Sequence, residues 1–590
     1  MNLFDRHTFH IPVLGLGYSI DTPISVAPYG ISSVISLVDD TLIESMREFY
    51  SEKFDIPFKA ISKKVDDFRA ERISSYLNLV DEIVTRKVDE LKKSVSTAGG
   101  ELEKYIDMLP DMCTIKETFN LADKSKHAFD ELSKWVNEKL TVGSIDVNIM
   151  TKLDKVNYKN GEELPIEHND AHAALRGFAN SNLSSALVLS AGMSPRLFSY
   201  IENFKDFFPN SAGIIKKQII LKVSDFRSAL IQGKMLAAKG LWVSEYRIES
   251  GVNCGGHAFP TNGVLFGPIL EEFRNNRERL YTTCIELYKS ALDKKEIRQP
   301  AEAPELKVTA QGGVGTSEEH NFLLDYYKMD SVGWATPFML VPEVISIDTE
   351  TMDLLAKGKE KDYYYSGLSP LGVPFNSIYG ASMSIQRLEM AKNGQAGTPC
   401  TKGFLKYNTE FTEKPICTSS RQYQTLKLKE LAEMNLPKEE YEKAFNKIIE
   451  KECLCIGLGV STIKSKKMEV KPTDQVTVCP GPNLAYFSKI STLKEMVDHI
   501  YGRTNLLDEG HRPHMFMKEL KMYLDIFKER FEEFKKDLDN TKEKKQLIKF
   551  QKNIFDGVNY YKELFAEKKK EVVEEMEKLL GKYSVIHTEL

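Results

Sequence analysis

The sequence predicts an α/β fold: a parallel TIM (β/α)8 barrel with a large helical insertion after its second strand and an α-rich C-terminal extension. The main evidence is a series of short apolar runs followed by glycine motifs, namely Gly255-Gly256-His257, Gly312-Gly313 and Gly333-Trp334-Ala335-Thr336. Glycine at the end of a strand lets backbone N–H groups approach a phosphate, because no Cβ intervenes. Three such ends in chain order indicate one barrel mouth that holds a phosphorylated cofactor.

Length and composition are consistent with this fold and exclude several classes of protein. The chain has 590 residues, 42% hydrophobic and 28% charged, which is typical of globular proteins large enough for several domains. A net charge of -5 gives no electrostatic signature of nucleic-acid binding. The sequence has no apolar run of about 18 residues and no signal peptide at its start, so we expect no membrane segment and a cytoplasmic protein. Eight cysteines in such a chain indicate reduced thiols.

The first part of the chain predicts two strands and then a helical block. Residues 21–30 form an apolar run bounded by prolines and a glycine, which indicates a buried first strand, and residues 32–38 indicate the second. From 41 to 140 apolar residues recur at three- and four-residue spacing, as on a helix face. A barrel loop usually has about 2–6 residues, so this block is predicted to be an insertion.

The alternation of strands and helices then resumes. Further strands are predicted at residues 144–150, 185–192, 218–223, 240–244, 306–315 and 329–336. A helix is predicted at 225–238 between two of them. The total of eight strands with intervening helices is the pattern of a parallel α/β barrel.

Four regions follow from these patterns. We expect the barrel in residues 1–40 and 141–345, the helical insertion in 41–140, a Cys-, Gly- and Pro-rich extension covering the barrel in 346–510, and a charged helical hairpin in 511–590. Asp539-Asn540-Thr541 is the expected break of the hairpin. A solvated appendage is the favoured interpretation of this hairpin. A partner-binding coiled coil is the alternative, although the apolar stripe is irregular and aromatic.

The order of short motifs along residues 10–345 resembles the nitronate monooxygenase (2-nitropropane dioxygenase) family and the related flavin-dependent enoyl-acyl-carrier-protein reductases. The motifs are Ala27-Pro28-Tyr29-Gly30, Val147-Asn148-Ile149, Ser190-Ala191-Gly192, Lys222-Val223-Ser224, Cys254-Gly255-Gly256-His257, Ala310-Gln311-Gly312-Gly313-Val314 and Gly333-Trp334-Ala335-Thr336. Each motif is weak alone, and the set gains weight from its order. The resemblance implies a TIM barrel that binds flavin mononucleotide (FMN).

The resemblance also implies cofactor-binding residues. Asn148 would bond the polar edge of the flavin with its amide, and Lys222 would stabilise the reduced ring. Tyr29 stands where the family commonly has methionine, so it marks a departure on the substrate side. The complete expected set is Ala27, Pro28 and Tyr29 beneath the ring, Asn148, Lys222, Gly255 and Gly256 around it, and Gly312, Gly313, Gly333, Ala335 and Thr336 at the phosphate.

His257 is the predicted catalytic residue. The histidine of the Gly-Gly-His motif approaches the flavin in the family, where it acts as a general base or contacts substrate. An imidazole suits this role because its pKa of about 6.5 lies near working pH. Cys254 beside it is expected to be a small packing residue. His168, Asp170 and His172 have a metal-like composition, but we expect them to be solvated or to line the cleft.

The C-terminal cysteines leave two interpretations open. Buried inert thiols are the commoner arrangement. An iron–sulfur cluster or a zinc ion is the minor alternative, because the spacing matches no compact signature. The residues concerned are Cys400, Cys417, Cys453, Cys455 and Cys479.

The favoured function is an FMN-dependent oxidoreductase resembling nitronate monooxygenase, which oxidises a small carbon acid over the flavin with His257 as base. A flavin-dependent enoyl reductase that uses NAD(P)H is the close alternative, with an acyl carrier or another protein docking on the helical extension. A scaffold that binds FMN or another phosphate ligand without catalysis is the alternative of a different class.

Overall fold

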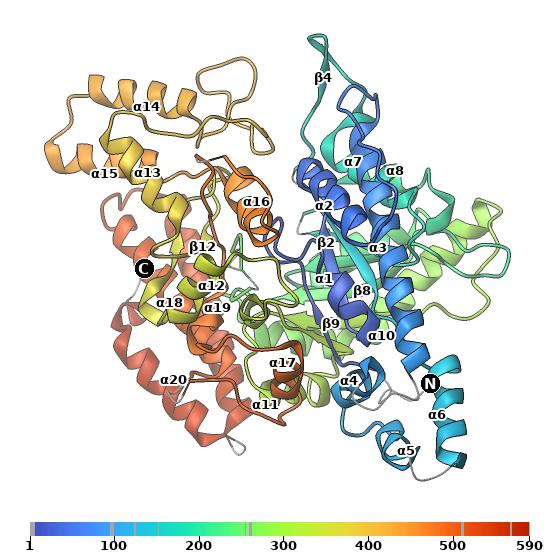
Figure 1. Cartoon of the computed structure of the whole chain (residues 1–590). Helices are drawn as coiled ribbons and strands as arrows, with labels where there is room; N and C mark the ends of the chain where they lie inside the picture. Colours follow the sequence, from blue (N-terminus) through green and yellow to red (C-terminus); the bar gives the residue numbers. More distant parts are fainter. Residues whose placement is uncertain are drawn as a thin grey trace.

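In the computed structural model, the described part of the chain comprises residues 6–94, 100–122, 126–151, 153–190, 192–253, 255–258, 262–471, 473–508, 512–566 and 569–588. Eight parallel strands form a closed barrel in which the last strand pairs with the first (Figure 1). In chain order they are β1 (Phe9–Ile11), β2 (Ser32–Ser36), β3 (Ile145–Met150), β6 (Ala186–Ser190), β7 (Gln218–Val223), β8 (Val243–Glu249), β9 (Lys307–Gln311) and β10 (Ser331–Gly333). The predicted TIM barrel is confirmed.

The predicted first strand is wrong. Residues 22–29 form helix α1 (Thr22–Val26) and the 3-10 helix η2 (Ala27–Tyr29), and the first strand is the three-residue β1. Each of these two helices carries a proline in its first turn, where the missing N–H breaks no hydrogen bond. The apolar run is therefore buried as a helix. The sixth strand of the barrel also lies later than predicted, at β8, because Gly240 adopts a left-handed turn with φ 75°.

The barrel interior is polar. On β8, Glu245 accepts a hydrogen bond from Arg247 at 2.7 Å and from Thr309 of β9 at 2.6 Å. His10 of β1 shares a hydrogen bond of 3.0 Å with Ser331 of β10. Burial alone would raise the pKa of Glu245, but Arg247 and its other partners lower it to about 2. An ion pair within β8, bonded to Thr309 of β9, thus lies where such barrels commonly have branched apolar residues.

The insertion between β2 and β3 is helical, as predicted. Its helices are α2 (Asp40–Lys53), α3 (Phe68–Lys93), α4 (Glu101–Met108), α5 (Ile115–Ala122) and α6 (Lys126–Glu138). Arg69 and Arg72 of α3 both pair with Asp40 of α2, at 2.8 and 2.9 Å. Helices α2 and α3 pack into the main core, whereas α4 to α6 enclose a small core of their own.

Other helices follow the later strands or build the extension. They are α7 (Asp170–Ala179), α8 (Pro195–Ile201), α9 (Phe226–Ala237), α10 (Phe266–Lys294) and α11 (Ser317–Asp325), then α12 (Thr349–Lys357), α13 (Ser382–Lys392), α14 (Arg421–Glu433), α15 (Lys438–Ile449), α16 (Leu454–Ser465) and α17 (Leu493–Ile500). Two hairpins complete the list: β4 (Tyr158–Lys159) with β5 (Glu162–Glu163), and β11 (Tyr363–Ser366) with β12 (Phe375–Ile378).

The C-terminal region has three helices, α18 (Met515–Phe534), α19 (Thr541–Phe565) and α20 (Lys570–Lys582), where a two-helix hairpin was predicted. They lie together on one side of the barrel (Figure 1). Their aromatic stripe is buried rather than solvated: Phe516 of α18 stacks on Tyr561 of α19 and contacts Phe266 and Phe322 of the barrel helices. The expectation of a solvated appendage is therefore wrong.

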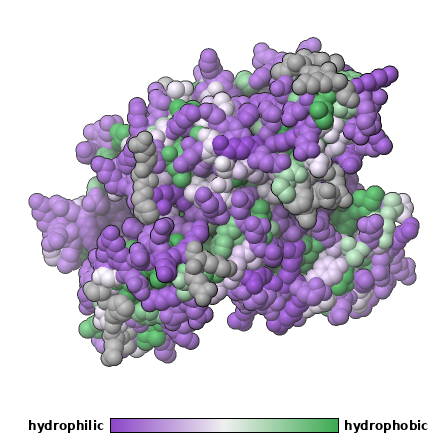
Figure 2. Space-filling view, turned by 90° about the horizontal axis from the view of Figure 1, so that it is seen from below, coloured by the Kyte–Doolittle hydropathy of each residue, from purple (hydrophilic) through white to green (hydrophobic). Residues whose placement is uncertain are grey.

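The polarity of the outer surface agrees with the burial of the aromatic stripe. The face seen in Figure 2 is largely hydrophilic, and its hydrophobic areas are small and separate. Among the described helices, none combines the length and the apolar character needed to cross a membrane.

Candidate functional site

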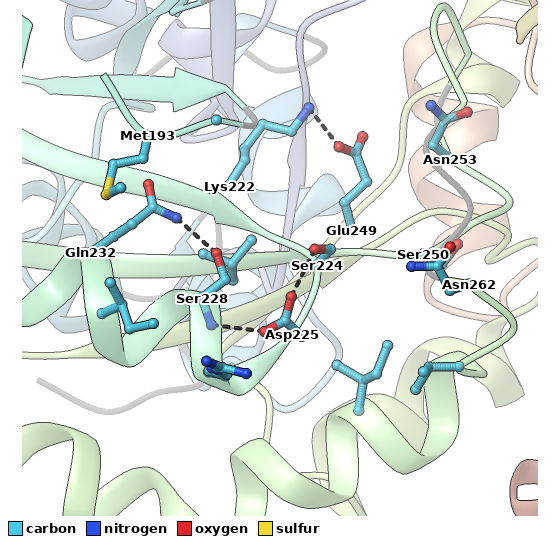
Figure 3. A pocket seen from close by; sticks show the side chains of 16 residues that line it. Met193, Lys222, Ser224, Asp225, Ser228, Gln232, Glu249, Ser250, Asn253 and Asn262 are labelled. Atoms are coloured by element: carbon cyan, nitrogen blue, oxygen red, sulfur yellow. Dashed lines mark hydrogen bonds and ion pairs between the residues drawn. The ribbon is translucent and has the colours of Figure 1, made fainter. Parts of the chain in front are cut away.

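A cavity of about 710 Å³ opens at the carboxyl ends of β6, β7 and β8 (Figure 3). Ligand sites of parallel barrels lie at this end of the strands, and the volume falls within the usual range of about 300–1,000 Å³ for ligand pockets. Polar residues of its wall include Lys222, Ser224, Asp225, Ser228, Gln232, Glu249, Ser250, Asn253 and Asn262.

An ion pair stands at the cavity wall. Lys222, near the end of β7, places Nζ 2.9 Å from the Glu249 carboxylate at the end of β8. The other carboxylate oxygen of Glu249 accepts a hydrogen bond from Gln311 Nε2 at 3.0 Å. Both charged side chains are mostly buried, at 13% and 18% exposure, so the cation has a defined position. Lys222 thus lines the cavity, and its predicted role beside a flavin stays a prediction.

The N-terminus of α9 faces the same cavity. Asp225 caps the helix by accepting from the Ser228 N–H at 2.7 Å, and it also accepts from the Ser224 hydroxyl at 3.1 Å (Figure 3). Gln232 donates to the Ser228 hydroxyl at 2.9 Å. The capping carboxylate thus satisfies one N–H of this helix end, and Lys222 and Arg227 both line the cavity.

Three buried polar atoms near the carboxyl ends of the strands lack a partner among the described residues. They are Oδ1 of Asn148 on β3, Oε1 of Gln311 at the end of β9 and Oγ of Ser250, which directly follows β8. Asn148 is only 3% exposed, Gln311 1% and Ser250 6%. A buried polar atom without a hydrogen bond costs about 1–3 kcal/mol, so a ligand that supplied hydrogen-bonding groups to these atoms would recover that cost.

His257 is held by the C-terminal extension. Its Nε2 shares a 2.6 Å hydrogen bond with the hydroxyl of Ser369, which is fully buried. Its ring meets Phe375 of β12 edge-on at 5.2 Å. The backbone carbonyl of His257 accepts from Asn253 Nδ2 at 2.5 Å, and Asn253 lines the cavity. His257 therefore lies between the cavity wall and the extension, although its side chain is not part of the wall.

The two glycines before His257 have different surroundings. Both have positive φ, 118° at Gly255 and 73° at Gly256. A Cβ on Gly255 would lie 2.1 Å from the Cys479 carbonyl oxygen, whereas a Cβ on Gly256 would meet no described atom within 4 Å. Only Gly256 thus leaves space for a ligand. Gly255 instead makes room for residues 478–481 of the extension. Cys254, in the same motif, lies outside the described residues, as does Ala191.

The glycines predicted to cradle phosphate lie at the same mouth but not on the cavity. A Cβ on Gly312 would meet Ser250 Oγ at 2.6 Å, and the Gly313 carbonyl accepts from Arg512 at 2.6 Å. The Thr336 hydroxyl accepts from the Gly481 N–H at 3.2 Å. Gly333 and Ala335 are buried beside it. The extension therefore packs over the loops that follow β9 and β10.

Ala27, Pro28 and Tyr29 lie at the opposite rim, so their predicted place beneath a flavin at this mouth is wrong. The Ala27 carbonyl accepts from Gly143 N–H at 2.9 Å, just before β3 begins, and the Tyr29 carbonyl accepts from His7 before β1 begins. The Tyr29 hydroxyl donates to Glu101 of the insertion. The physical reason is that these residues form a helical turn leading into β2 instead of ending a strand.

The sequence analysis missed Glu249, Ser250 and Asn253. Their signal was available: they follow the apolar residues of β8 and precede the glycine pair. The predicted strand ended too early, at residue 244, so they appeared to be loop residues.

The residues considered as possible metal ligands lie in different places in the structure. The Cys479 carbonyl accepts a hydrogen bond from the Gly256 N–H at 3.3 Å. Across the described residues, no group of three or more His, Cys, Asp or Glu side chains is placed to hold a metal ion. Asp170 pairs with Arg69 at 3.6 Å, and His172 lies beside Asp154. These side chains belong to a local ion network beneath the insertion.

A buried carboxylate joins α18 to the loops next to the cavity. Glu519 is 2% exposed and accepts from the backbone N–H groups of Gly251 at 3.0 Å and Phe266 at 2.7 Å. Burial outweighs these two bonds and raises the pKa of Glu519 from 4.5 to about 7.

This group makes stability depend on pH. Because the folded pKa lies above the unfolded one, the folded protein binds the proton more tightly, and the free energy of unfolding falls as pH rises from 4.5 through about 7. The expected loss is about 3 kcal/mol. Urea unfolding at pH 5, 6 and 7.5 should show it, and the Glu519→Gln variant should lack this slope. Equal pH dependence in both proteins would contradict the assignment.

Comparison with known proteins finds similar solved structures at low identity. No family model matches the chain, and no curated protein does. Similar solved structures include FabK from Thermotoga maritima, with 12% identity over 65% of this chain and 80% of that chain and a TM-score of 0.32. The enoyl reductase domain of MlnA from the macrolactin biosynthesis cluster of Bacillus amyloliquefaciens has 12% identity over 64% and 85% and a TM-score of 0.35. A nitroalkane oxidase from Streptomyces ansochromogenes has 9% identity over 85% and 96% and a TM-score of 0.33. At these TM-scores the likenesses carry no argument, and the fold is established by the strand pairings alone.

Proposed function

We propose that this chain is an FMN-dependent oxidoreductase with its flavin ring at the carboxyl mouth of β3, β7 and β8. The observation that carries the proposal is the pair of unpartnered buried atoms, Asn148 Oδ1 and Ser250 Oγ, at the same mouth as the Lys222–Glu249 ion pair and the cavity. A flavin ring has one N–H donor and several acceptors along its polar edge. Asn148 Oδ1 would accept from the donor, and the Ser250 hydroxyl and Lys222 would donate to acceptors.

When bound, FMN would supply the two-electron chemistry that no side chain provides. Lys222 would favour negative charge beside it, and Glu249 keeps the ammonium group in place. His257 would take a proton from a small carbon acid. The Ser369 hydroxyl, 2.6 Å from Nε2, would hold the imidazole in place for this role. Nitronate monooxygenase-like oxidation is the specific reaction we propose.

The loops that follow β9 and β10 are covered by the C-terminal extension, and this favours one competing function. Gly481 and Arg512 occupy hydrogen-bonding positions at Thr336 and Gly313, where the family resemblance implies a phosphate. If no phosphate enters there, the chain would be a scaffold without FMN. An NAD(P)H-dependent enoyl reductase would use the same mouth and differ in its electron donor.

FMN binding separates these functions. We expect the purified chain to take up one FMN, with a visible spectrum that bleaches on addition of a nitronate. Asn148→Leu should weaken FMN binding about tenfold, since one lost hydrogen bond corresponds to about 1.4 kcal/mol. Asn275→Leu, at an exposed position of α10, is the matched control and should bind as the wild type does.

His257→Ala tests the catalytic role separately. This variant should bind FMN normally and lose about 100-fold or more in turnover, the usual contribution of a general base. Absence of FMN binding in the wild type would favour the scaffold. Bleaching by NADPH but not by a nitronate would favour the reductase, and full activity of His257→Ala would remove the proposed base.

A further inference from the structure

The side chain of Asn253 bridges the turn that carries His257. Its Oδ1 accepts from the Gly255 N–H at 3.2 Å, and its Nδ2 donates to the His257 carbonyl at 2.5 Å. A backbone N–H only donates and a carbonyl only accepts, so these two partners fix the orientation of the amide. The oxygen of Asn253 therefore points toward the start of the turn and its nitrogen toward the end.

A second amide, that of Asn376 on β12, reaches the same turn from the C-terminal extension. Its Nδ2 donates to Asn253 Oδ1 at 2.9 Å and to the Gly256 carbonyl at 3.1 Å. Its backbone N–H donates to the same carbonyl at 2.9 Å. Both acceptors require a donor at this position, and Asn376 is only 3% exposed, so water does not replace it readily.

Backbone pairing with β12 adds to these side-chain bonds. His257 forms an antiparallel bridge with Phe375, and the Ala258 N–H donates to the Pro374 carbonyl at 2.9 Å. The imidazole in turn contacts Ser369 and the Phe375 ring. Both the backbone and the ring of His257 are thus placed by β12 and the segment before it.

The contacts separate positioning from ligand binding. Asn253 is part of the cavity wall, whereas Asn376 is not among the described residues that form it. Both lone pairs of Asn253 Oδ1 and one of its two N–H groups are already engaged. Asn376 is therefore placed to act on the turn and on Asn253 rather than on a ligand directly.

We propose that Asn376 is a positioning residue for His257, acting through Asn253 and the Gly256 carbonyl. The inference rests on the proposed function, because it takes His257 as the base. Without the Asn376 amide, the Gly256 carbonyl keeps one donor of two and Asn253 loses the partner that holds its oxygen. The turn then gains freedom next to the imidazole. A displacement of about 1 Å at a reacting group costs about 100-fold in rate.

Asn376→Asp tests this role with almost no change in shape. A carboxylate accepts but does not donate, so it would face two other acceptors, Asn253 Oδ1 and the Gly256 carbonyl. We expect FMN affinity and the KM for a nitronate to stay near the wild-type values. The kcat, normalised to bound FMN, should fall by about 10- to 100-fold. Normalisation separates misplacement of the base from loss of folded protein.

Acylation of His257 by diethyl pyrocarbonate gives a readout that needs no flavin. His257 is half-buried, and peptide mass spectrometry measures its rate of modification in the full-length chain. The rate should rise about tenfold in Asn376→Asp, the change in local opening that one lost hydrogen bond allows. His499, which is 3% exposed and bonded to the Gly315 carbonyl, is the internal reference and should keep its rate.

Two further variants complete the test. Asn376→Ala removes the side-chain donors without adding a charge, and its backbone N–H still reaches the Gly256 carbonyl. It should therefore lose less kcat than Asn376→Asp, and it serves if the latter folds poorly. Asn446→Asp, at an exposed position of α15, makes the same chemical change away from the turn and should match the wild type in every measurement.

The outcomes distinguish this inference from the proposed function. Unchanged His257 acylation in both Asn376 variants would overturn the positioning role, whether or not the chain binds FMN. Weaker FMN binding in Asn376→Asp, with His257 acylation unchanged, would also overturn it and would assign Asn376 to the cofactor. Absence of FMN from the wild type would instead remove the proposed function and leave the acylation result to decide whether Asn376 holds the turn.

Discussion

Alanine in place of Gly255 is expected to destabilise the protein strongly. Its Cβ would lie 2.1 Å from the carbonyl oxygen of Cys479, which is a backbone atom and has no rotamer to change. The φ of 118° is itself unfavourable for any residue with a Cβ. Backbone strain of this kind costs about 1–3 kcal/mol, and displacing residues 478–481 adds to it. We expect a total loss of about 3 kcal/mol or more in the free energy of unfolding.

The next residue provides a matched control for this prediction. Gly256→Ala places a methyl group where no described atom lies within 4 Å, at a φ of 73°. We expect it to lose only about 1–2 kcal/mol, the cost of a left-handed conformation. Urea unfolding gives both values. Trypsin cleavage within 464–471 should become faster in Gly255→Ala alone, because that segment leads into the displaced residues. Equal losses in the two variants would mean that residues 478–481 do not press on Gly255.

Removal of the Arg512 guanidinium is expected to have the second large effect. Arg512 pairs with Glu319 at 2.7 Å and donates to the Asn483 side chain at 2.9 Å and the Gly313 carbonyl at 2.6 Å. The ion pair is 6% and 3% exposed. Arg512→Leu would leave a buried carboxylate without its cation, which typically costs about 3–5 kcal/mol. Urea unfolding at pH 7.5 measures this loss.

Two measurements distinguish the loss of the Arg512 charge from the loss of its packing: the pH dependence of the free energy of unfolding and a second variant. Burial pushes the pKa of Glu319 up, but Arg512 and the Gly315 N–H outweigh it and keep the pKa below 4.5. This stabilisation is present above pH 4.5 and is lost as pH falls. The deficit of Arg512→Leu should therefore shrink as pH falls below 4.5, and Glu319→Gln should restore part of the stability.

An exposed pair on the same helix serves as control. Lys521 and Asp525 of α18 lie 3.3 Å apart at 43% and 52% exposure. Lys521→Met should change stability by less than about 1 kcal/mol, as surface ion pairs usually do. A loss for Arg512→Leu no larger than this would contradict the role of the buried pair in attaching α18 to the barrel.

Most of the barrel could be predicted from local patterns, and the exception is instructive. Seven of the strands follow apolar runs that precede glycines or polar turns. The first strand, Phe9–Ile11, has three residues, too few for a periodic pattern. The competing run at 22–29 is more apolar, yet its prolines suit the first turns of helices. Local composition therefore selected the wrong segment.

The site was less predictable than the fold. Lys222 lies on the cavity as expected, because a strand end can be located from sequence. Glu249 and Ser250 depend on where β8 ends, which register with β7 and β9 decides. The contact of Ser369 with His257 joins residues 112 positions apart, and no local pattern encodes such a pair.

The amino-acid sequence by itself determined the closed parallel barrel, the insertion after the second strand and the placement of Lys222 and the Gly255-Gly256-His257 motif at one mouth. These features arise from hydrophobic periodicity and from glycine, which act over a few residues. Only the tertiary structure decided that the extension packs over Gly255, Gly313 and Thr336, and that Ser369 holds His257. Such contacts depend on how distant surfaces fit together, since the packing that stabilises them is non-local.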